Sequence, residues 1–434
     1  MSDLSEDELI EPRDRATETG RPVGVLVDAY GTGNYLPPAF DRLGIDVVHL
    51  QSSPEPITRM QAWDPTAYRD ALVYDPDGST ERALKELDPR FLIPGQEPGV
   101  LLADQLSETL GLRTNGTTYS RARRDKFEMI EAVAGAGLLT AAQRITDDAE
   151  EAVAWAQANG YWPCVAKPLS SASTDGVFVC RDAEALRAAF PAILDSTTVF
   201  NGANTEVLVQ SFLHGTEYIV DTVSVDGHAY VCGVWEYEKL LLPNGKPIYN
   251  RDILLSSTDP AVLTLIDYTR AMLDALRIHN GPAHSEVIIT ANGPALVEVG
   301  ARINGDMHPA FHDSCLGANM ADLTAQAYAR PEEFLARYRD GVYQQRQPAV
   351  VYNTPTTLSG TVVSVDEAVV EKIRDRPSVV DISVKRKPGD VIVPTLDLLT
   401  SPLRVFLTAP DQATVAEDYA FIDSVRESVY EVRP

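Results

Sequence analysis

Short apolar runs alternate with amphipathic stretches along the first quarter of the chain. The runs VGVLVD (23–28) and IDVVHL (45–50) have the length and the Val, Ile and Leu content that are typical of buried strands. Further strands are predicted at 71–74 and 91–94, and helices at 38–43 and 99–110. Because strands that alternate with helices usually pair in parallel, residues 21–120 are predicted to form a small α/β domain with a parallel sheet.

The middle of the chain has a different pattern, in which several strands follow one another directly. Turn residues separate these apolar runs, and this order predicts antiparallel pairing. The predicted strands lie at 162–168, 177–180, 206–210, 218–225 and 228–234, and the predicted helices at 121–138, 260–276 and 318–329. Residues 235–255 carry many charges and are predicted to form a long loop, which in a compact domain is usually functional or disordered.

The helix predicted at 121–138 begins with a basic segment. Asp125 and Glu128 have the spacing of a capping box, so Lys126 is expected in the first helical turn. Free N–H groups at a helix start, together with a nearby cation, suit a phosphate. The alternative is an ordinary solvated lysine. The apolar stripe of this helix is predicted to consist of Phe127, Ile130 and Ala134.

A β-hairpin is predicted at 284–304, HSEVIITANGPALVEVGARIN. An Asn-Gly-Pro turn at 292–294 separates two β-rich runs, and folding about that turn places Glu286 opposite Glu298. Directly opposed carboxylates repel each other in a sheet, so this pattern favours a cation bound between them. Two carboxylates and phosphate oxygens are typical ligands of Mg²⁺. The alternative is a solvated hairpin with both glutamates facing outward.

A second lysine, Lys167, ends the strand at 162–168 and precedes a loop of small and polar residues, LSSASTDG (169–176). The N–H groups of such a loop can hold phosphates, although no Walker A pattern occurs in the chain. The alternative is a flexible hairpin tip. The loop AYGTGNY (29–35) lacks the third glycine of a dinucleotide fingerprint, and the second strand is not followed by an acidic residue, so the pattern does not indicate a nicotinamide site.

Residues 345–434 are predicted to form a small α+β subdomain without a catalytic constellation. Its strands are predicted at 360–365 and 391–393 and its helices at 366–375 and 412–427.

Composition narrows the class of protein. The chain has 434 residues, of which 44% are hydrophobic and 23% charged, as in ordinary globular proteins of several domains. No apolar run approaches the ~20 residues of a membrane span, and the acidic N-terminal segment lacks the order of a signal peptide. The four separated cysteines favour reduced thiols, and the net charge of −26 argues against a nucleic-acid partner. A cytoplasmic protein with neither a nucleic-acid nor a membrane partner is therefore expected.

Taken in order, these segments resemble the ATP-grasp superfamily over about residues 21–335. Within the superfamily the chain is similar to carboxylate–amine ligases of the L-amino-acid ligase type. The segments that carry this similarity are GQEPGV (95–100), RRDKF (123–127), GPAHSEV (281–287) and EVGARINGD (298–306). The resemblance implies a multidomain α/β and α+β protein with an ATP-grasp fold. Its predicted parts are a disordered leader (1–20), an N-terminal parallel α/β domain (21–120), a lid subdomain (121–205), a core subdomain (206–344) and a small C-terminal α+β subdomain (345–434).

The resemblance also implies a nucleotide site for ATP. Lys126 and Lys167 would contact the phosphates, and the loop from Ser170 through Ser171 to Gly176 would fold over them. The adenine edge would meet Gln210, Ser211 and Leu213, and the ribose hydroxyls would be held by Glu217. Gln210 stands where many members of the superfamily have a glutamate.

The implied metal is Mg²⁺, with Glu286 and Glu298 as ligands and Asn304 as a further candidate. Gly300 stands where many members have an asparagine. Two alternatives stay open, namely that Asn304 compensates and that one metal is held more loosely. Arg302 would stabilise the transferred phosphoryl group, with Lys167 and His284 as the other catalytic residues.

The activity implied by the resemblance is ATP-dependent ligation of a carboxylate, expected to be an amino acid, to an amine. The reaction would pass through an acyl phosphate and release ADP and phosphate. Two alternatives stay open, namely a ligase of nucleotide or cofactor biosynthesis and a non-catalytic nucleotide-binding regulatory protein. The expected partners are small-molecule substrates, and a homodimer is an open possibility for the assembly.

Overall fold

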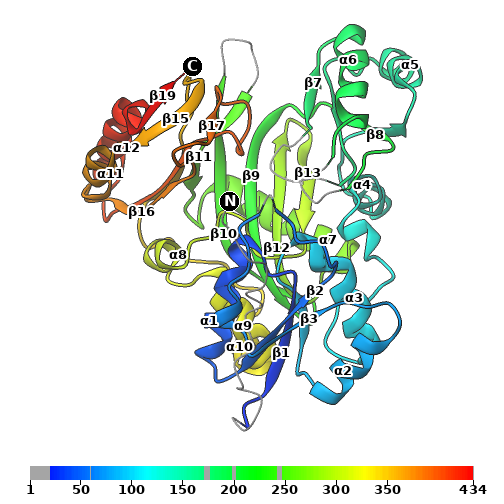
Figure 1. Cartoon of the computed structure of the whole chain (residues 1–434). Helices are drawn as coiled ribbons and strands as arrows, with labels where there is room; N and C mark the ends of the chain where they lie inside the picture. The colour runs from blue at the N-terminus through cyan, green and yellow to red at the C-terminus, as the bar shows by residue number, and fades with distance from the viewer. Residues whose placement is uncertain (1–19, 59, 171–175, 198–201, 242–246, 434) are drawn as a thin grey trace, which may run out of the picture.

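The computed structural model describes residues 20–58, 60–170, 176–197, 202–241 and 247–433 (Figure 1). The leader predicted at 1–20, apart from its last residue, lies outside the described residues. Ser171 and most of the predicted phosphate loop also lie outside them.

The N-terminal domain is built around a four-stranded sheet in the order β3-β2-β1-β4. All of its strand pairs are parallel, which confirms the predicted parallel α/β domain. Its strands are β1 (Val23–Val27), β2 (Asp46–Gln51), β3 (Asp70–Val73) and β4 (Leu92–Pro94), and its helices are α1 (Leu36–Asp41), α2 (Ser79–Leu87) and α3 (Val100–Thr109). The residues of β1 are all buried, because neighbours cover both faces of this strand.

A second four-stranded sheet, antiparallel and in the order β5-β8-β6-β7, forms the lid region together with two helices. These elements are β5 (Gln143–Thr146), β6 (Cys164–Lys167), β7 (Phe178–Cys180), β8 (Val207–Ser211), α5 (Ala149–Asn159) and α6 (Ala183–Leu194). The sheet therefore extends to Ser211, past residue 205, where the lid subdomain is predicted to end.

The largest sheet has eight strands in the order β13-β12-β9-β10-β11-β14-β18-β16, and all of its neighbouring pairs are antiparallel. The strands of its first part are β9 (Gly215–Val225), β10 (His228–Leu241), β11 (Pro247–Leu254), β12 (Gly281–Thr290) and β13 (Gly293–Gly300). The sheet continues into the C-terminal region with β14 (Ala349–Asn353), β16 (Val379–Val384) and β18 (Leu403–Thr408). The predicted core and C-terminal subdomains thus share one sheet.

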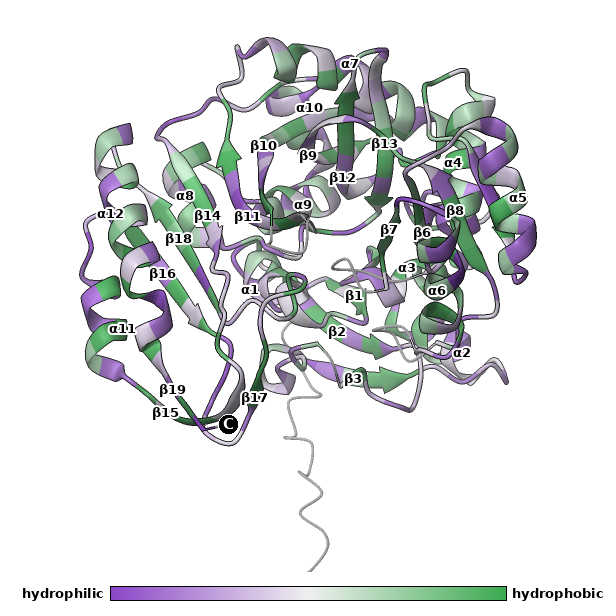
Figure 2. Ribbon diagram, turned by 90° about the horizontal axis from the view of Figure 1, so that it is seen from above, coloured by the Kyte–Doolittle hydropathy of each residue, from purple (hydrophilic) through white to green (hydrophobic). Residues whose placement is uncertain are grey.

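The remaining elements surround this sheet. The C-terminal region adds a small sheet in the order β17-β15-β19, made of β15 (Gly360–Val365), β17 (Val391–Ile392) and β19 (Tyr430–Arg433). The other helices are α4 (Lys126–Gly135), α7 (Pro260–Ala275), α8 (Pro309–Leu316), α9 (Met320–Ala329), α10 (Pro331–Tyr338), α11 (Glu367–Arg374) and α12 (Gln412–Val425). Short 3₁₀ helices lie at Gly31–Tyr35, Pro65–Ala67, Glu97–Gly99, Arg121–Arg123 and Arg426–Val429. Seen from above, β14, β16 and β18 lie on one side of β9 to β12, and the lid strands lie on the other side (Figure 2).

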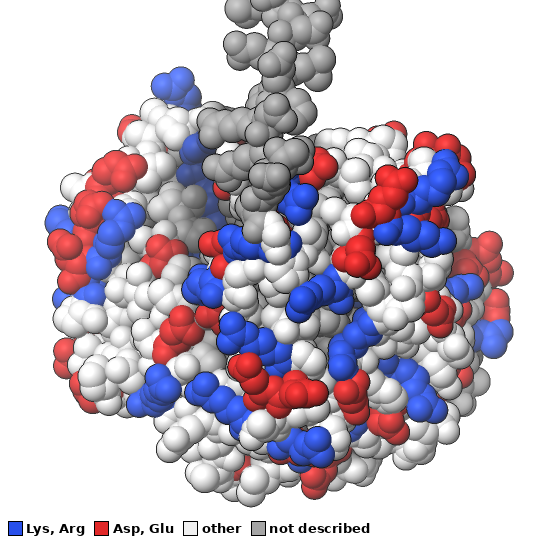
Figure 3. All heavy atoms as spheres, turned by 90° about the horizontal axis from the view of Figure 1, so that it is seen from below, with Lys and Arg blue, Asp and Glu red and all other residues white. Residues whose placement is uncertain are grey.

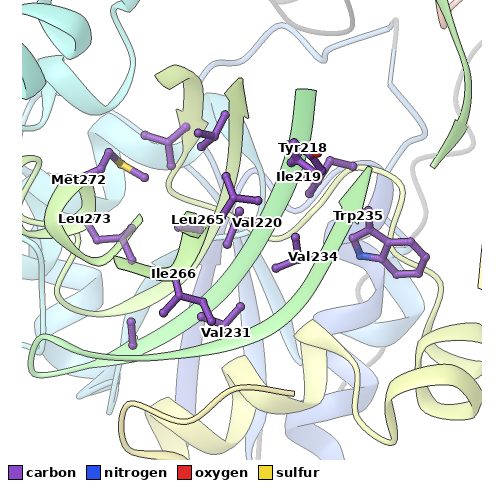
Figure 4. Packing of buried hydrophobic residues seen from close by; sticks show 14 of the residues in the cluster. Tyr218, Ile219, Val220, Val231, Val234, Trp235, Leu265, Ile266, Met272 and Leu273 are labelled. Carbon is purple, nitrogen blue, oxygen red and sulfur yellow. The ribbon is translucent and has the colours of Figure 1, made fainter. Parts of the chain in front are cut away.

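Apolar side chains of α7 pack against the large sheet. Leu265 and Met272 of α7 lie in the same buried cluster as Val220 and Val231 of the sheet (Figure 4). Each of these side chains is fully buried, and burial of one such side chain stabilises a fold by roughly 1.5–3 kcal/mol. This packing holds the central strands, and the polar groups that they carry, in a fixed arrangement.

Two sequence-based predictions are wrong. Of the loop predicted at 235–255, residues 242–246 lie outside the described residues, and the described parts up to Leu254 belong to the paired strands β10 and β11. Trp235 and Tyr237 of β10 are buried and alternate with more exposed charged residues. The high charge hid this alternation of period two. The stripe predicted for α4 is also displaced, since its buried residues are Met129, Ile130 and Val133.

Charged side chains of both signs are interspersed on the face seen from below (Figure 3). None of the described helices combines the length and the apolar character that crossing a membrane requires.

Candidate active site

The hairpin of β12 and β13 has the predicted register, with Glu286 opposite Glu298. Its turn places Gly293 at φ +119°, a conformation that favours glycine. The register then shifts, because Val287 lies opposite Leu296 and leaves Val297 as an extra residue on β13. Such a bulge can redirect neighbouring side chains, and both Val297 and Glu298 line the same cavity.

A cavity of about 430 Å³ lies between the lid sheet and this hairpin. It brings together eight of the predicted site residues, namely Lys126, Lys167, Gln210, Ser211, Leu213, Glu217, Glu286 and Glu298. Its apolar wall includes Val165, Val177, Val179, Ile288, Val297 and Leu398. A cavity with one apolar wall and charged groups elsewhere can hold a ligand that combines a flat base with phosphates.

One end of this cavity is cationic. Lys126 is the first residue of α4, and the side chain of Asp125 accepts hydrogen bonds from N–H groups in the first turn of this helix. The Nζ of Lys126 lies 2.6 Å from Glu298 Oε2. Lys167 is buried at the end of β6, where burial and then the charge of Lys126 lower its pKa to about 8. Burial by itself would raise the pKa of Glu298, but Lys126, Lys167 and Arg302 hold that pKa below its usual value. This end can neutralise the charge of phosphate groups.

The carboxylate of Glu217 is held rigidly in another part of the cavity. It is buried, it forms an ion pair with Lys239, and the Tyr249 hydroxyl donates a hydrogen bond of 3.0 Å to its Oε1. Burial raises the pKa of Glu217, and Lys239 acts in the opposite direction. A fixed carboxylate of this kind can accept hydrogen bonds from the hydroxyl groups of a ligand.

The polar edge of the cavity near the lid sheet is formed by β8. The Gln210 side chain donates a hydrogen bond of 3.1 Å to Gln143 Oε1, and the Ser211 N–H donates one of 2.8 Å to the Ala142 carbonyl. Leu213 follows β8 and also lines the cavity. The polar groups of this edge could bond to the edge of a flat base, while the apolar wall could contact the faces of the base.

Arg302 lies in a separate charged cluster beside the hairpin. Its Nε is 3.1 Å from Glu97 Oε2, and Arg124 Nη1 is 2.6 Å from Glu97 Oε1. Arg124 also donates a hydrogen bond of 3.3 Å to Ser170 Oγ. Burial opposes the ionisation of Glu97, but Arg124 and Arg302 lower its pKa below the usual value. Glu97 therefore fixes both guanidinium groups next to the start of the predicted phosphate loop.

His284 forms a third group with Asp221 and Asn304. Its Nδ1 lies 2.8 Å from Asp221 Oδ1, and its Nε2 lies 3.8 Å from Glu286 Oε1. Burial acts against the charged form, but the hydrogen bond to Asp221 and the nearby carboxylate of Glu286 raise the pKa of His284 to about 9. The Asn304 amide donates to Asp221 Oδ2 at 2.9 Å, and its oxygen accepts from the Asp306 N–H at 2.8 Å. Asn304 thus positions Asp221 and its own loop, and metal ligation by this residue stays a prediction.

The two opposed glutamates fit a Mg²⁺ ion that is completed by ligand oxygens. Among the described residues, no group of three or more His, Cys, Asp or Glu side chains is arranged to hold a metal. Mg²⁺ commonly binds proteins through one or two carboxylates and fills its other positions with water and phosphate oxygens. Glu286 is oriented by the Tyr237 hydroxyl, which donates to its Oε1 at 3.3 Å.

Sequence reasoning missed several residues of these clusters. Glu97 and Arg124 lie inside the motifs GQEPGV and RRDKF, so a role could have been sought there. Lys239 and Tyr249 were missed because the hairpin was predicted to be a loop, and no local signal marks Leu398.

Gly176, at the described end of the predicted phosphate loop, has φ +70°, and a Cβ there would lie 2.8 Å from Pro168 Cγ.

Known proteins resemble this chain in sequence and in fold. A family described as the ATP-grasp domain matches residues 161–310. The chain is 33% identical over 416 residues to dapdiamide A synthase from Enterobacter agglomerans, covering 94% of this chain and 97% of that protein. The structure is similar to that of an L-amino acid ligase from Bacillus licheniformis, with a TM-score of 0.72, 20% identity, and coverage of 96% and 100%. It is also similar to a carboxyaminoimidazole ribonucleotide synthase from Aspergillus clavatus complexed with ATP, with a TM-score of 0.68, 15% identity, and coverage of 94% and 99%.

Proposed function

The chain belongs to the ATP-grasp carboxylate–amine ligases, and from this premise we propose that it joins the carboxylate of an amino acid to the amine of a second one. The observation that carries the proposal is the placement of Glu286 and Glu298 beside Lys126 and Lys167 in one cavity. The names of the relatives, a dapdiamide synthase and an L-amino acid ligase, support amino acids as substrates. The full-length similarity to the former favours this function over nucleotide biosynthesis.

We propose that the cavity binds ATP with its phosphates toward Lys126 and Lys167. Glu217 would then accept hydrogen bonds from the ribose, and the adenine would lie between the apolar wall and the polar edge at Gln210. Glu286 and Glu298 would hold Mg²⁺, which neutralises charge on phosphate oxygens when it is bound. A protein of similar fold has been solved with MgADP, which supports a magnesium–nucleotide complex as the ligand of this fold.

The chemistry requires that a carboxylate be activated before an amine can attack it. A substrate carboxylate oxygen attacks the γ-phosphorus of ATP, the bond between that phosphorus and the bridging oxygen breaks, and ADP leaves. We propose that Arg302, which Glu97 holds at 3.1 Å, would stabilise charge on the transferred phosphoryl group and on the acyl oxygen. The nitrogen of the amine then forms the new bond to the acyl carbon, phosphate leaves, and the amine loses a proton.

The identity of the released nucleotide tests the proposed mechanism. With a panel of amino acids and MgATP, we expect ADP and phosphate to form, because in the proposed binding mode the cations and the paired glutamates would surround the terminal phosphates. When the substrate carboxylate carries ¹⁸O, one labelled oxygen should appear in the released phosphate. Mass spectrometry of phosphate and chromatography of the nucleotides provide both measurements.

AMP and pyrophosphate as products would instead indicate an acyl adenylate and would overturn this mechanism. Nucleotide binding without any turnover across the panel would support a regulatory protein. A reaction without amino acids is the control for background ATP hydrolysis.

A substitution at Glu217 tests the proposed ribose contact. Because a hydrogen bond to a charged group contributes about 1.5–3 kcal/mol, Glu217→Gln should raise the KM for ATP roughly tenfold or more. The kcat should change little, since the ribose is remote from the reacting atoms. Steady-state kinetics with ATP and 2′-deoxy-ATP or 3′-deoxy-ATP provide the measurement.

The deoxynucleotides supply the control for this prediction. The wild-type enzyme should lose affinity for at least one of them, and the Glu217→Gln variant should lose much less. Equal losses in both proteins would show that Glu217 does not contact the ribose hydroxyls.

A further inference from the structure

The C-terminal region contributes side chains to the same face of the large sheet as the proposed site. Directly opposed residues of antiparallel strands present their side chains on one face. The register pairs Tyr237 with Asp252, Asp252 with Val351, Val351 with Phe406, and Asn353 with Arg404. Since Tyr237 bonds to Glu286, this face leads from the proposed metal site to β18.

Lys385 lies on this face as well. Ser383 is paired with Arg404, so the two side chains lie on one face of the sheet. Lys385 follows Ser383 by two residues, and because side chains in a strand alternate with a period of two, its side chain lies on that face too. The Lys385 N–H still bonds to the Pro402 carbonyl at 2.9 Å, so the two chain segments remain side by side there. Figure 2 shows β16 and β18 together at the side of the sheet away from the lid.

A chain of polar contacts connects this region to the proposed metal ligand Glu286. Arg404 Nη1 lies 2.6 Å from Asp306 Oδ1, and the Asp306 N–H bonds to Asn304. Asn304 then bonds to Asp221, which is paired with His284 beside Glu286. Asp306 is also only four residues beyond Arg302. The cations of the C-terminal region are therefore linked through Asp306 to the residues that surround the proposed site of the activated carboxylate.

Lys385 is a cation without an ion-pair partner. Within the described part of the chain, no carboxylate oxygen lies within the 4.0 Å limit of an ion pair with its Nζ. Burial, followed by the charge of Arg404, lowers the pKa of Lys385 to about 7, while Asp306 acts in the opposite direction. An anionic group beside this ammonium would restore the charged form.

Two further cations, Arg404 and Arg386, lie near Lys385. Arg404 is paired with Asp306, and Arg386 donates hydrogen bonds to the carbonyls of Lys385 and Leu399, the latter at 2.7 Å. Asp252 is buried, one of its oxygens has no hydrogen-bond partner, and burial raises its pKa well above the usual value. Asp252 also favours the charged form of Lys385, but less than Asp306 does. A further carboxylate on this face, that of Asp381, lies 3.5 Å from His308 Nε2.

From this placement we propose that the acyl donor carries a second carboxylate, which is bound by Lys385 and Arg404. The proposal rests on the proposed function, because the first carboxylate must be activated near Arg302. The class of donor is thus an acidic amino acid or a related dicarboxylic acid. Arg386 supports the same site by bonding to the segment that carries Leu398 into the nucleotide cavity.

Donors that differ only in the second carboxylate test the proposal. Hydroxylamine can replace the amine, so that hydroxamate formation from MgATP and each donor is measured without knowledge of the natural amine. The matched pairs are aspartate with asparagine and glutamate with glutamine. We expect the acid of at least one pair to have a kcat/KM roughly tenfold or more above that of its amide, the scale of a charge-assisted hydrogen bond.

Variants of Lys385 locate this preference. Lys385→Ala should raise the KM for the acid roughly tenfold or more and leave the KM for ATP unchanged. Lys385→Arg keeps the charge and should retain much of the preference. The matched control is Lys387→Ala, because Lys387 is an exposed lysine two residues further along the same segment. Thermal unfolding of each variant shows whether it is folded.

The outcomes separate this proposal from the proposed function. Hydroxamate formation from neutral donors with no preference for acids, in the wild-type enzyme, would overturn the second carboxylate and leave the ligase function intact. An acid preference that survives in a folded Lys385→Ala variant would also overturn it. No donor-dependent hydroxamate or ADP with any donor would contradict both proposals.

Discussion

Glu298→Gln should lower kcat at least ~10²-fold while the protein remains folded, the scale of losing one electrostatic stabiliser. Glutamine keeps the size of the side chain but removes the charge that faces Lys126 at 2.6 Å and that would bind Mg²⁺ together with Glu286. The weaker metal site should also shift the dependence of rate on Mg²⁺ to higher concentrations. Turnover measured across a Mg²⁺ titration, with circular dichroism to verify folding, tests this expectation.

The control for this variant is Glu332→Gln, which removes a carboxylate exposed on α10. It should have the activity and the Mg²⁺ dependence of the wild-type enzyme. Near-normal turnover of Glu298→Gln at ordinary Mg²⁺ concentrations would remove Glu298 from the site.

Arg302→Ala should lower kcat by about 10²–10³-fold, because it removes a donor aimed at charge that develops in the transition state. The KM for ATP should change much less, since Arg302 does not line the nucleotide cavity among the described residues. Arg302→Lys should recover only part of the activity, because an ammonium lacks the planar fork of a guanidinium. Steady-state kinetics with saturating ATP give both parameters.

Two further variants distinguish a catalytic role of Arg302 from a structural one. Arg69→Ala removes an exposed arginine of the N-terminal domain and should leave kcat unchanged. Glu97→Gln leaves Arg302 in place but removes the carboxylate that fixes it, so we expect a smaller loss than for Arg302→Ala. If Arg302→Ala has wild-type kcat, the proposed stabilisation of the phosphoryl group is wrong.

Sequence patterns were sufficient wherever neighbouring residues determine the geometry. The parallel strands of the N-terminal domain follow from apolar runs that alternate with helices. The register of Glu286 and Glu298 follows from the position of one turn between two β-rich runs, since side chains in a strand alternate with a period of two. Between 235 and 255 the same period of two is present, but charged residues stand between the apolar ones. The high charge therefore led to the wrong prediction of a loop.

The tertiary structure decided which distant groups share a site. Glu97 and Arg302 are 205 residues apart in the chain and form an ion pair only because the N-terminal domain packs against the hairpin. Leu398 reaches the nucleotide cavity, and Lys385 the face beside Arg404, because C-terminal strands extend the large sheet. A local sequence pattern indicates the periodicity of an element and the position of a turn. These contacts depend instead on which faces of remote segments pack against each other. The spacing of residues along the sequence does not determine that packing.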